Sequence, residues 1–405
     1  MPSHFVSLKV SLDKRDNSSL GKINLSFEKL KPDDLEYPSL ICANFDGASV
    51  NLGQKGGVIA KIREVIPNVL GLHCVAHKLE LAALDANKHC KYVIEQFEQT
   101  VKGIFNFYHY SPKRRREVKE VADVLDVTFS HMSDVKQVRW MSSKYRAIEA
   151  LQKNYPAIVT HLEHNSASGN RADDANKAKG YLKDLRSLKF LKHLYFLLDY
   201  LPVLTNLSKQ FQLEDLLIIE IPDLVEAAVL KLNALKTTPG KFMKIFCEQY
   251  NVTERKFGDI KLSDTGKLSP VDFKTDKDIH AFLDSGINYI KQRFQHLSEP
   301  PLSYFEIFNF HKWPLSRSDL STYGQQDLTN LLNDPSISPF FSDEEKDGII
   351  SEWVPVKYNI QNGSFLNPDV ALSFAQQTIL SYLVVAFYSQ DLILILVILK
   401  ESNGT

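Results

Sequence analysis

The first part of the chain alternates short apolar runs with stretches of helical period. Ser39–Phe45 is an apolar run of strand length, and the glycines at Gly56-Gly57 open a helical pattern that Pro67 stops. Val69–Cys74 is a second apolar run, and a second helical pattern follows it. This succession of strand, helix, strand and helix predicts a layered α/β domain.

From about Arg139 onward, apolar residues recur mostly at helical spacing. The clearest helical stretches are Arg146–Leu151, Ala178–Leu201, Leu213–Leu235 and Asp276–Leu297. The polar stretches Asn165–Lys177 and Lys261–Pro270 interrupt them and are predicted to be loops. We therefore expect an all-helical block over about 150–300 and a region of short helices over about 301–360.

Two apolar runs lie near the C-terminus, Ile379–Tyr388 and Leu392–Leu399, with Asp391 between them. A membrane span needs about 20 mostly apolar residues, and a central Asp costs roughly 2.5–3.5 kcal/mol on insertion. We therefore expect no membrane partner and interpret the runs as a buried pair of strands or an atypical tail. Met1–Lys9 lacks the basic flank and apolar core of a signal peptide.

Composition and charge narrow the class of protein further. The chain has 405 residues, of which 44% are hydrophobic and 24% charged, and 48 Lys+Arg against 49 Asp+Glu leave a net charge of -1. These values exclude a disordered chain, a polytopic membrane protein and a uniformly basic DNA-coating protein, but they allow a local basic patch. Four cysteines are too few for a disulfide-built secreted domain, so we expect free thiols in a reducing compartment.

Asp46 follows the first predicted strand and precedes a glycine-containing turn. A carboxylate at a strand end is well placed to bind Mg²⁺, as in many phosphoryl-transfer sites. The alternative is a plain strand–turn–helix in which Asp46 is a turn or N-cap residue. The stretch lacks the Gly-Lys-Ser/Thr ending of a phosphate-binding loop.

Cys74 and His77 lie three residues apart where the second strand runs into a helix. At this spacing both could face one metal ion, but a structural zinc site needs four ligands. His89 and Cys90 are adjacent on one helix and point in different directions. The alternative is a strand end that enters a helix, with Cys74 buried and His77 hydrogen-bonded.

Two further motifs could contact a nucleic acid. Arg139-Trp140 could hold a phosphate and stack on an unpaired base, or Trp140 could simply lie in the core. The run Lys113-Arg114-Arg115-Arg116 suits phosphate contact or a nuclear import signal, or it is the solvated first turn of a helix after Pro112. Cations at a helix N-terminus are unfavourable for the helix dipole, which favours a functional reason for them.

Three stretches carry a resemblance to a known family: FDGASVNLGQKGG at Phe45–Gly57, LHCVAHKLELAALDA at Leu72–Ala86 and VRWMSSKYRAIEAL at Val138–Leu151. In this order they resemble the transposase domain of the hAT superfamily, above all vertebrate-type transposon-derived members that often carry zinc fingers elsewhere in the chain. A weaker likeness continues through Phe196–Leu216, His311–Gly324 and Ser351–Lys357.

The resemblance implies an α/β plus all-α protein, in which an incomplete RNase H-like core is interrupted by a large helical insertion. The implied divisions are an N-terminal segment over 1–36, a partial RNase H-like α/β core over 37–145, a helical insertion over 146–300, its short-helix C-terminal part over 301–360, and a divergent apolar tail over 361–405.

In this family two Asp and one Glu hold the divalent metal that supports DNA strand cleavage and transfer. Asp46 matches the second Asp, but the first should lie in an upstream Asp-x-Ser-Thr-Asp-like strand that the stretch Leu12–Asp16 does not match. The third acid should lie near the C-terminus within a Ser-x-x-x-Glu-Arg-x-Phe-Ser-like motif, and this chain has no Glu-Arg-x-Phe. We therefore expect no enzyme activity and no cofactor, with Mg²⁺ only if the site were complete.

By the same resemblance, Cys74, His77, Arg139 and Trp140 match positions tied to DNA handling. We expect a truncated or domesticated, catalytically inactive protein of the nucleus that binds DNA or unidentified protein partners, without a recognisable copy of the family's dimerisation region. Two alternatives stay open: a fragment of an active transposase, and a helical interaction scaffold without DNA binding.

Overall fold

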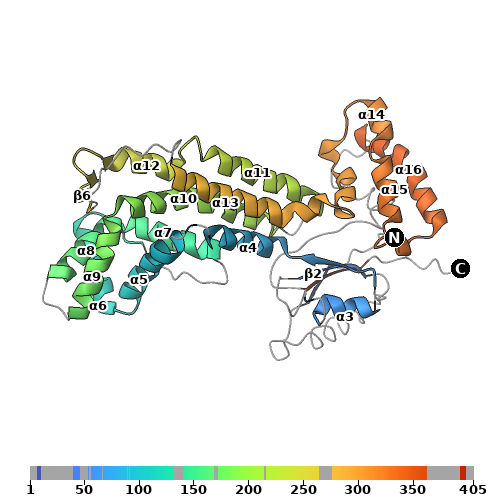
Figure 1. The fold of residues 1–405 in the computed structure, drawn as a ribbon. Coiled ribbons are helices and arrows are strands. Elements are labelled where there is room, and N and C mark those ends of the chain that lie inside the picture. Colours follow the sequence, from blue (N-terminus) through green and yellow to red (C-terminus); the bar gives the residue numbers. More distant parts are fainter. Residues whose placement is uncertain are drawn as a thin grey trace. The chain divides into compact units, whose positions relative to one another are not determined.

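A computed structural model shows the arrangement of the chain (Figure 1). It describes residues 7–10, 40–45, 53, 56–65, 67–88, 90, 92–130, 140–167, 172–213, 216–263, 276–362 and 393–397. These fall into two compact units: unit 1 comes from 1–78, 209–224 and 293–405, and unit 2 from 79–208 and 225–292. Each unit is therefore assembled from distant stretches of chain, whereas the predicted divisions follow the sequence.

Unit 1 contains a four-stranded sheet in the order β1-β7-β2-β3. Its strands are β1 (Ser7–Val10), β7 (Ile393–Val397), β2 (Leu40–Phe45) and β3 (Leu70–His73). The pair β2 and β3 is parallel, with Phe45 opposite His73, and confirms both strands predicted from the apolar runs. The strand β7 pairs antiparallel with both β1 and β2.

The two ends of the chain differ from the prediction in one respect. The N-terminal segment and the apolar tail each contribute a strand, so neither stands apart from the α/β part. The physical reason is that strand pairing joins any two extended segments whatever their separation in sequence, and local patterns do not reveal partners. Within the described residues, no helix is long and apolar enough to cross a membrane.

The helices next to the sheet follow the predicted pattern. Helix α3 (Val58–Val65) begins after Gly57 and ends before Pro67, as expected. It lies close to β3, because a Cβ atom added at Gly71 would stand 2.5 Å from Ile59 Cγ1. The second predicted helix is α4 (Val75–Lys88), which follows β3 directly.

Unit 2 is almost entirely helical. It holds all or most of η3 (Val93–Phe97), α5 (Glu98–His109), α6 (Pro112–Val124), α7 (Trp140–Lys153), α8 (Tyr155–Ala167), α9 (Ala172–Leu185), α10 (Leu188–Gln210), α11 (Ile221–Ala234), α12 (Lys241–Gln249) and α13 (Lys277–Phe294). Thirteen residues of α10 are buried, including Phe190 and Leu201, because its sequence is apolar on nearly every face. The mixed, mostly helical class is therefore confirmed in this coarse form.

Two predicted helical stretches are divided differently in the structure. The stretch predicted over 178–201 is two helices, since α9 ends at Leu185 and α10 begins at Leu188. Apolar residues on both sides of the short turn keep the helical spacing, so the pattern alone hides the break. The stretch predicted from Leu213 becomes α-helical only at Ile221, where Pro222 suits the first turn of a helix.

Two predicted irregular regions were also wrong in part. The polar loop predicted over 165–177 is mostly helix, with Asp173 and Asp174 in the first turn of α9, where acidic side chains favour the helix dipole. The block predicted as all-helical contains a small antiparallel sheet of β4 (Tyr250–Asn251), β5 (Lys256–Phe257) and β6 (Ile260–Lys261). Positive φ angles at Arg255 and Gly258 form its turns.

The short helices predicted over 301–360 are confirmed in unit 1. They are η6 (Gln295–Ser298), η7 (Leu302–Phe308), η8 (Phe310–Lys312), α14 (Arg317–Thr322), α15 (Gln325–Asn333), η9 (Ser338–Phe340) and the longer α16 (Asp343–Gln361).

Aromatic side chains and one lysine tie these helices together. Trp353 is buried and its Nε1 donates to the backbone oxygen of Tyr323 at 3.0 Å. Lys357 Nζ donates to the same oxygen and to that of Ser321, at the C-terminal end of α14, where a cation is favourable. Burial lowers the pKa of Lys357 to about 8. The family-like stretch Ser351–Lys357 therefore packs this part of the fold.

Candidate nucleic-acid interface

Several predicted site residues lie outside the described part of the chain. These are Asp46, the candidate catalytic and Mg²⁺-binding acid, and Arg139, the candidate phosphate ligand. His89, weighed as a zinc ligand, also lies outside it. Trp140 is the first residue of α7, but its side chain is not described, so its stacking role stays a prediction.

The Cys–His motif lies where β3 enters α4. Cys74 forms no disulfide among the described residues and is half-buried rather than buried, because it occupies the short connection between strand and helix. His77 makes a ring contact with His73, with centroids 5.3 Å apart. The expected hydrogen bond of His77 is not found among the described residues. Among the described residues, no three His, Cys, Asp or Glu side chains are grouped as metal ligands.

A cluster of three basic residues lies beside this motif in unit 1. We use the term Lys78 cluster for Lys78, Arg293 and His296. Lys78 Nζ lies 2.8 Å from His296 Nε2 and 3.2 Å from its Nδ1. Burial, with the charge of Arg293, lowers the pKa of Lys78 to about 8. Burial and the charge of Lys78 lower the pKa of His296 to about 4, so at neutral pH the ring is uncharged and accepts a hydrogen bond from the ammonium.

Sequence reasoning missed the Lys78 cluster. Lys78 stands directly after His77 in the quoted motif, and this adjacency is the one signal that could have drawn attention to it. Arg293 and His296 lie 215 or more residues farther along the chain, since Lys78 and His296 are separated by 218 positions. Only folding brings them together.

In unit 2 the structure joins two of the motifs that carry the family resemblance. Glu80 Oε2 accepts a hydrogen bond at 3.3 Å from the backbone nitrogen of Met141, in the first turn of α7. A carboxylate is favourable at that helix end. One turn farther along, Lys144 Nζ lies 2.5 Å from Glu98 Oε1 and is only 1% exposed. Glu80 therefore fixes the helix start at which Trp140 is located.

The basic run opens α6, as the helix interpretation of Pro112 predicts. Ser111 caps this helix, since its Oγ accepts from the backbone nitrogen of Arg114 at 3.3 Å. The Arg114 guanidinium lies 2.6 Å from Asp174 and 4.0 Å from the centre of the Phe107 ring. Arg114 therefore holds α6 against its neighbours and is not available for a phosphate.

The neighbouring cations of α6 have different surroundings. Lys113 pairs with Glu117 on the surface, at 3.6 Å. Arg115, Arg116 and Lys119 are exposed, and no described residue forms an ion pair or hydrogen bond with them. We call these three residues the α6 basic cluster. Residues three and four apart share one helix face, so the cluster is a compact positive patch.

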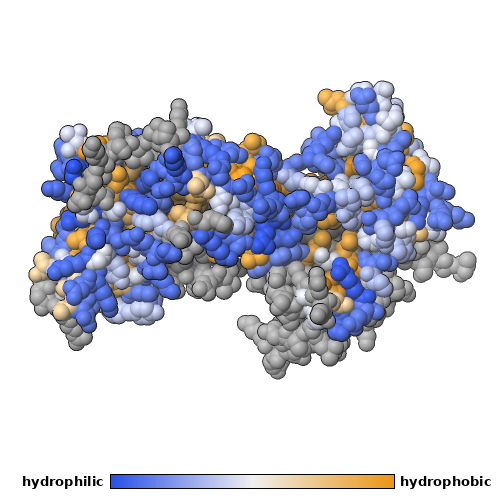
Figure 2. Space-filling view, viewed as in Figure 1, coloured by the Kyte–Doolittle hydropathy of each residue, from blue (hydrophilic) through white to orange (hydrophobic). Residues whose placement is uncertain are grey.

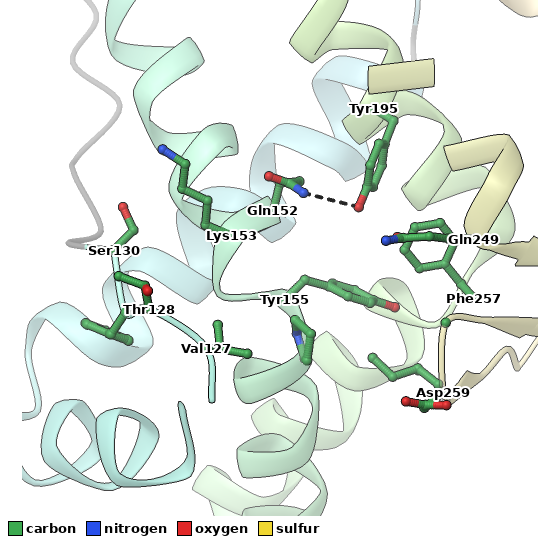
Figure 3. Close-up of a pocket in the computed structure, with 14 residues that line it drawn as sticks. Val127, Thr128, Ser130, Gln152, Lys153, Tyr155, Tyr195, Gln249, Phe257 and Asp259 are labelled. Atoms are coloured by element: carbon green, nitrogen blue, oxygen red, sulfur yellow. Dashed lines mark hydrogen bonds between the residues drawn. The ribbon is translucent and has the colours of Figure 1, made fainter. Parts of the chain in front are cut away.

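Unit 2 also contains a pocket that sequence reasoning did not find (Figure 3). Its volume is about 710 Å³, and it lies between residues 127–130 on one side and an aromatic wall on the other. The wall contains Tyr155, Tyr195 and Phe257, and Gln152 Nε2 donates to Tyr195 Oη at 3.4 Å. The lining residues come from five separate stretches of the chain, at 127–130, 152–156, 195, 249 and 257–260, so no local sequence pattern predicts the pocket.

No protein-family model matches the chain, and no solved structure matches it. The geometry of the described residues therefore carries the functional argument.

Proposed function

We propose that this chain is a nucleic-acid-binding protein derived from a hAT transposase and without strand-transfer activity. The observation that carries the proposal is the α6 basic cluster, whose three cations are exposed and have no carboxylate partner among the described residues. A guanidinium group can donate two parallel hydrogen bonds to two oxygens of one phosphate. The net charge of -1 means that such binding depends on local patches rather than on the whole chain.

The same proposal includes a remnant of an RNase H-like core around β2 and β3. The two strands are parallel, they are joined through α3, and Asp46 follows β2 in the sequence. Parallel strands joined by a helix are the βαβ unit of layered α/β folds. The absence of sequence matches for the first and third acids supports the loss of metal-dependent chemistry.

The test is the salt dependence of DNA binding by the full chain. Fluorescence anisotropy with a labelled duplex, between about 50 and 200 mM salt, should show log affinity falling linearly with log salt. Replacing Arg115 and Arg116 together with Ala should lower the magnitude of that slope by about 1.8, because each lost phosphate contact removes about 0.9. The matched control replaces Lys231 and Lys244, two exposed lysines on α11 and α12, and should leave the slope unchanged.

Equal slopes for the two double variants would contradict the assignment to α6. No binding even at about 50 mM salt would remove the nucleic-acid proposal itself. That result would favour an interaction scaffold, for which α16 offers an exposed apolar stripe of Ile350, Val354 and Tyr358. Figure 2 shows a mostly hydrophilic visible surface, with apolar side chains where α16 lies.

A further inference from the structure

We propose that the pocket of unit 2 binds a peptide segment of a partner protein and takes a basic side chain of that segment. The proposal goes beyond the proposed function, because it concerns a protein partner and not a nucleic acid. It rests on the cavity of about 710 Å³, on backbone groups of its rim that are unpaired among the described residues, and on the charge of Asp259.

One rim of the pocket is the short irregular segment over 127–130, which is anchored at both ends. The Val127 backbone nitrogen donates to the Ala122 oxygen at 2.9 Å. At the other end, the buried Asn154 side chain accepts from the Ser130 nitrogen at 2.9 Å and donates to the Ser130 oxygen at 2.7 Å. The rim is therefore held in place by the fold, which lowers the entropic cost of binding a ligand against it.

Between these anchors the backbone is unpaired. No described residue forms a hydrogen bond with the backbone groups of Thr128 or Phe129, and Thr128 is exposed. Each of these two residues offers one N–H donor and one C=O acceptor. A peptide group of a ligand also has one donor and one acceptor, so it can pair with this rim as an added strand pairs with a sheet edge. The rim therefore favours a peptide as the ligand.

The opposite side of the pocket supplies a negative charge. Asp259 lies in the turn between β5 and β6, is exposed, and forms no ion pair with a described residue. Lys153, the basic residue of the lining, is already paired with Glu149 at 2.9 Å, and Lys256 nearby is paired with Glu254 at 2.9 Å. Figure 3 shows Lys153 and Asp259 on opposite sides of the pocket. The lining therefore has one carboxylate that is not neutralised and favours a cation over an anion.

The rest of the lining suits the stem of a long basic side chain. Tyr155, Tyr195 and Phe257 are each at most 3% exposed and form the aromatic wall, and Ile260 beside them is half-buried. Arginine and lysine carry a methylene stem that covers apolar surface while the charged head stays near water. Aromatic rings also favour a nearby cation. The stem of such a side chain would lie on this wall, and its charged head would pair with Asp259.

The experiment is ligand-observed saturation-transfer NMR on the full chain, with acetyl-arginine N-methylamide as the probe. This compound carries two peptide groups and one guanidinium. Its citrulline counterpart has nearly the same shape without the charge and is the matched ligand. The arginine compound should bind about fivefold more tightly, the size of effect expected of an exposed ion pair. Equal affinities of the two compounds, or no binding of either, would overturn the proposal.

A charge variant assigns the binding to this pocket. Asp259→Asn keeps the shape of the side chain and should lower the affinity for the arginine compound about fivefold. The matched control is Asp123→Asn, because Asp123 is also exposed, forms no ion pair with a described residue and lies outside the pocket lining. It should bind as the wild type does. Circular dichroism should show the same helix content for both variants. A folded Asp259→Asn chain that binds the arginine compound as tightly as the wild type would contradict the assignment.

A third compound, n-butylguanidinium, tests the peptide part of the proposal. It has the charged head but no peptide groups, so it should bind several-fold more weakly than the arginine compound, because it cannot pair with the rim at Thr128 and Phe129. Equal affinity would overturn the assignment to a peptide. The Arg115/Arg116 double variant should bind the arginine compound normally, so failure of the nucleic-acid proposal and failure of this pocket give different results.

Discussion

Lys144 in unit 2 and Lys78 in unit 1 are both at least half-buried, but different groups surround their ammonium groups. In unit 2, Lys144 is fully buried and its ammonium lies 2.5 Å from the Glu98 carboxylate. Burial lowers the pKa of Lys144, and the nearby Glu98 opposes that shift. In unit 1, Lys78 is only half-buried but faces His296 and Arg293, and its pKa falls to about 8. Lys144 is paired with a carboxylate, whereas the hydrogen-bond partner of Lys78 among the described residues is the His296 ring.

Helix α6 repeats this contrast within one turn. Arg114 is paired with Asp174 and covered by Phe107, while Arg115 and Arg116 point to solvent without a described partner. Consecutive arginines of one basic run therefore have different roles: Arg114 packs the fold, whereas Arg115 and Arg116 can contact a ligand from solvent. The division follows from which residues of α6 face the neighbouring helices.

The largest expected effect is the loss of the carboxylate beside Lys144. Glu98→Ala should lower the free energy of unfolding by about 3 kcal/mol, because it removes the carboxylate that lies 2.5 Å from a buried ammonium. Urea unfolding followed by circular dichroism measures this change. Gln99→Ala, at the exposed neighbouring position, is the control and should change stability by less than about 0.5 kcal/mol. A loss below about 1 kcal/mol for Glu98→Ala would contradict the view that this pair neutralises a buried charge.

The next effect concerns His193, a buried group in unit 2 that is hydrogen-bonded to a backbone oxygen and to no carboxylate among the described residues. His193 is 3% exposed, and its Nδ1 lies 2.8 Å from the backbone oxygen of Lys189. Burial lowers its pKa to about 4. On acidification the unfolded chain binds the proton first, so the free energy of unfolding should fall as pH drops from about 6.5 to 4, by up to about 3 kcal/mol from this residue.

The measurement compares urea unfolding of the wild type and of His193→Leu between these two pH values. Other groups titrate in the same range, so the informative quantity is the difference between the two proteins. That difference should shrink as pH falls, because the variant cannot bind the extra proton. A difference that is constant with pH would mean that His193 is not held neutral by the fold.

The smallest expected effect tests whether Arg114 stabilises the fold more than its neighbours Arg115 and Arg116 do. Arg114→Ala should cost about 1–2 kcal/mol, since it removes a partly covered ion pair and a cation–π contact. Arg115→Ala and Arg116→Ala should each stay within about 0.5 kcal/mol of the wild type. Thermal unfolding of the three variants gives the comparison. Equal losses at all three positions would show that the run acts as one structural unit.

Local periodicity was enough to predict the elements near the start of the chain. The apolar runs became β2 and β3, and the stretch between Gly57 and Pro67 became α3, because alternation, turn glycines and a helix-stopping proline act over a few residues. It failed at the turn between α9 and α10, where apolar spacing continues across the break. It also missed the pairing of β7 with both β1 and β2.

By itself, the sequence determined the mixed class, the strand–helix start and the position of the basic run on α6. Only the tertiary structure decided that Arg114 is paired with Asp174 while Arg115 has no ion-pair partner among the described residues, and that Lys78 is hydrogen-bonded to His296. The physical reason is that hydrophobic spacing encodes which face of an element is buried, but the partner of a charge is set by another element that can lie 218 positions away.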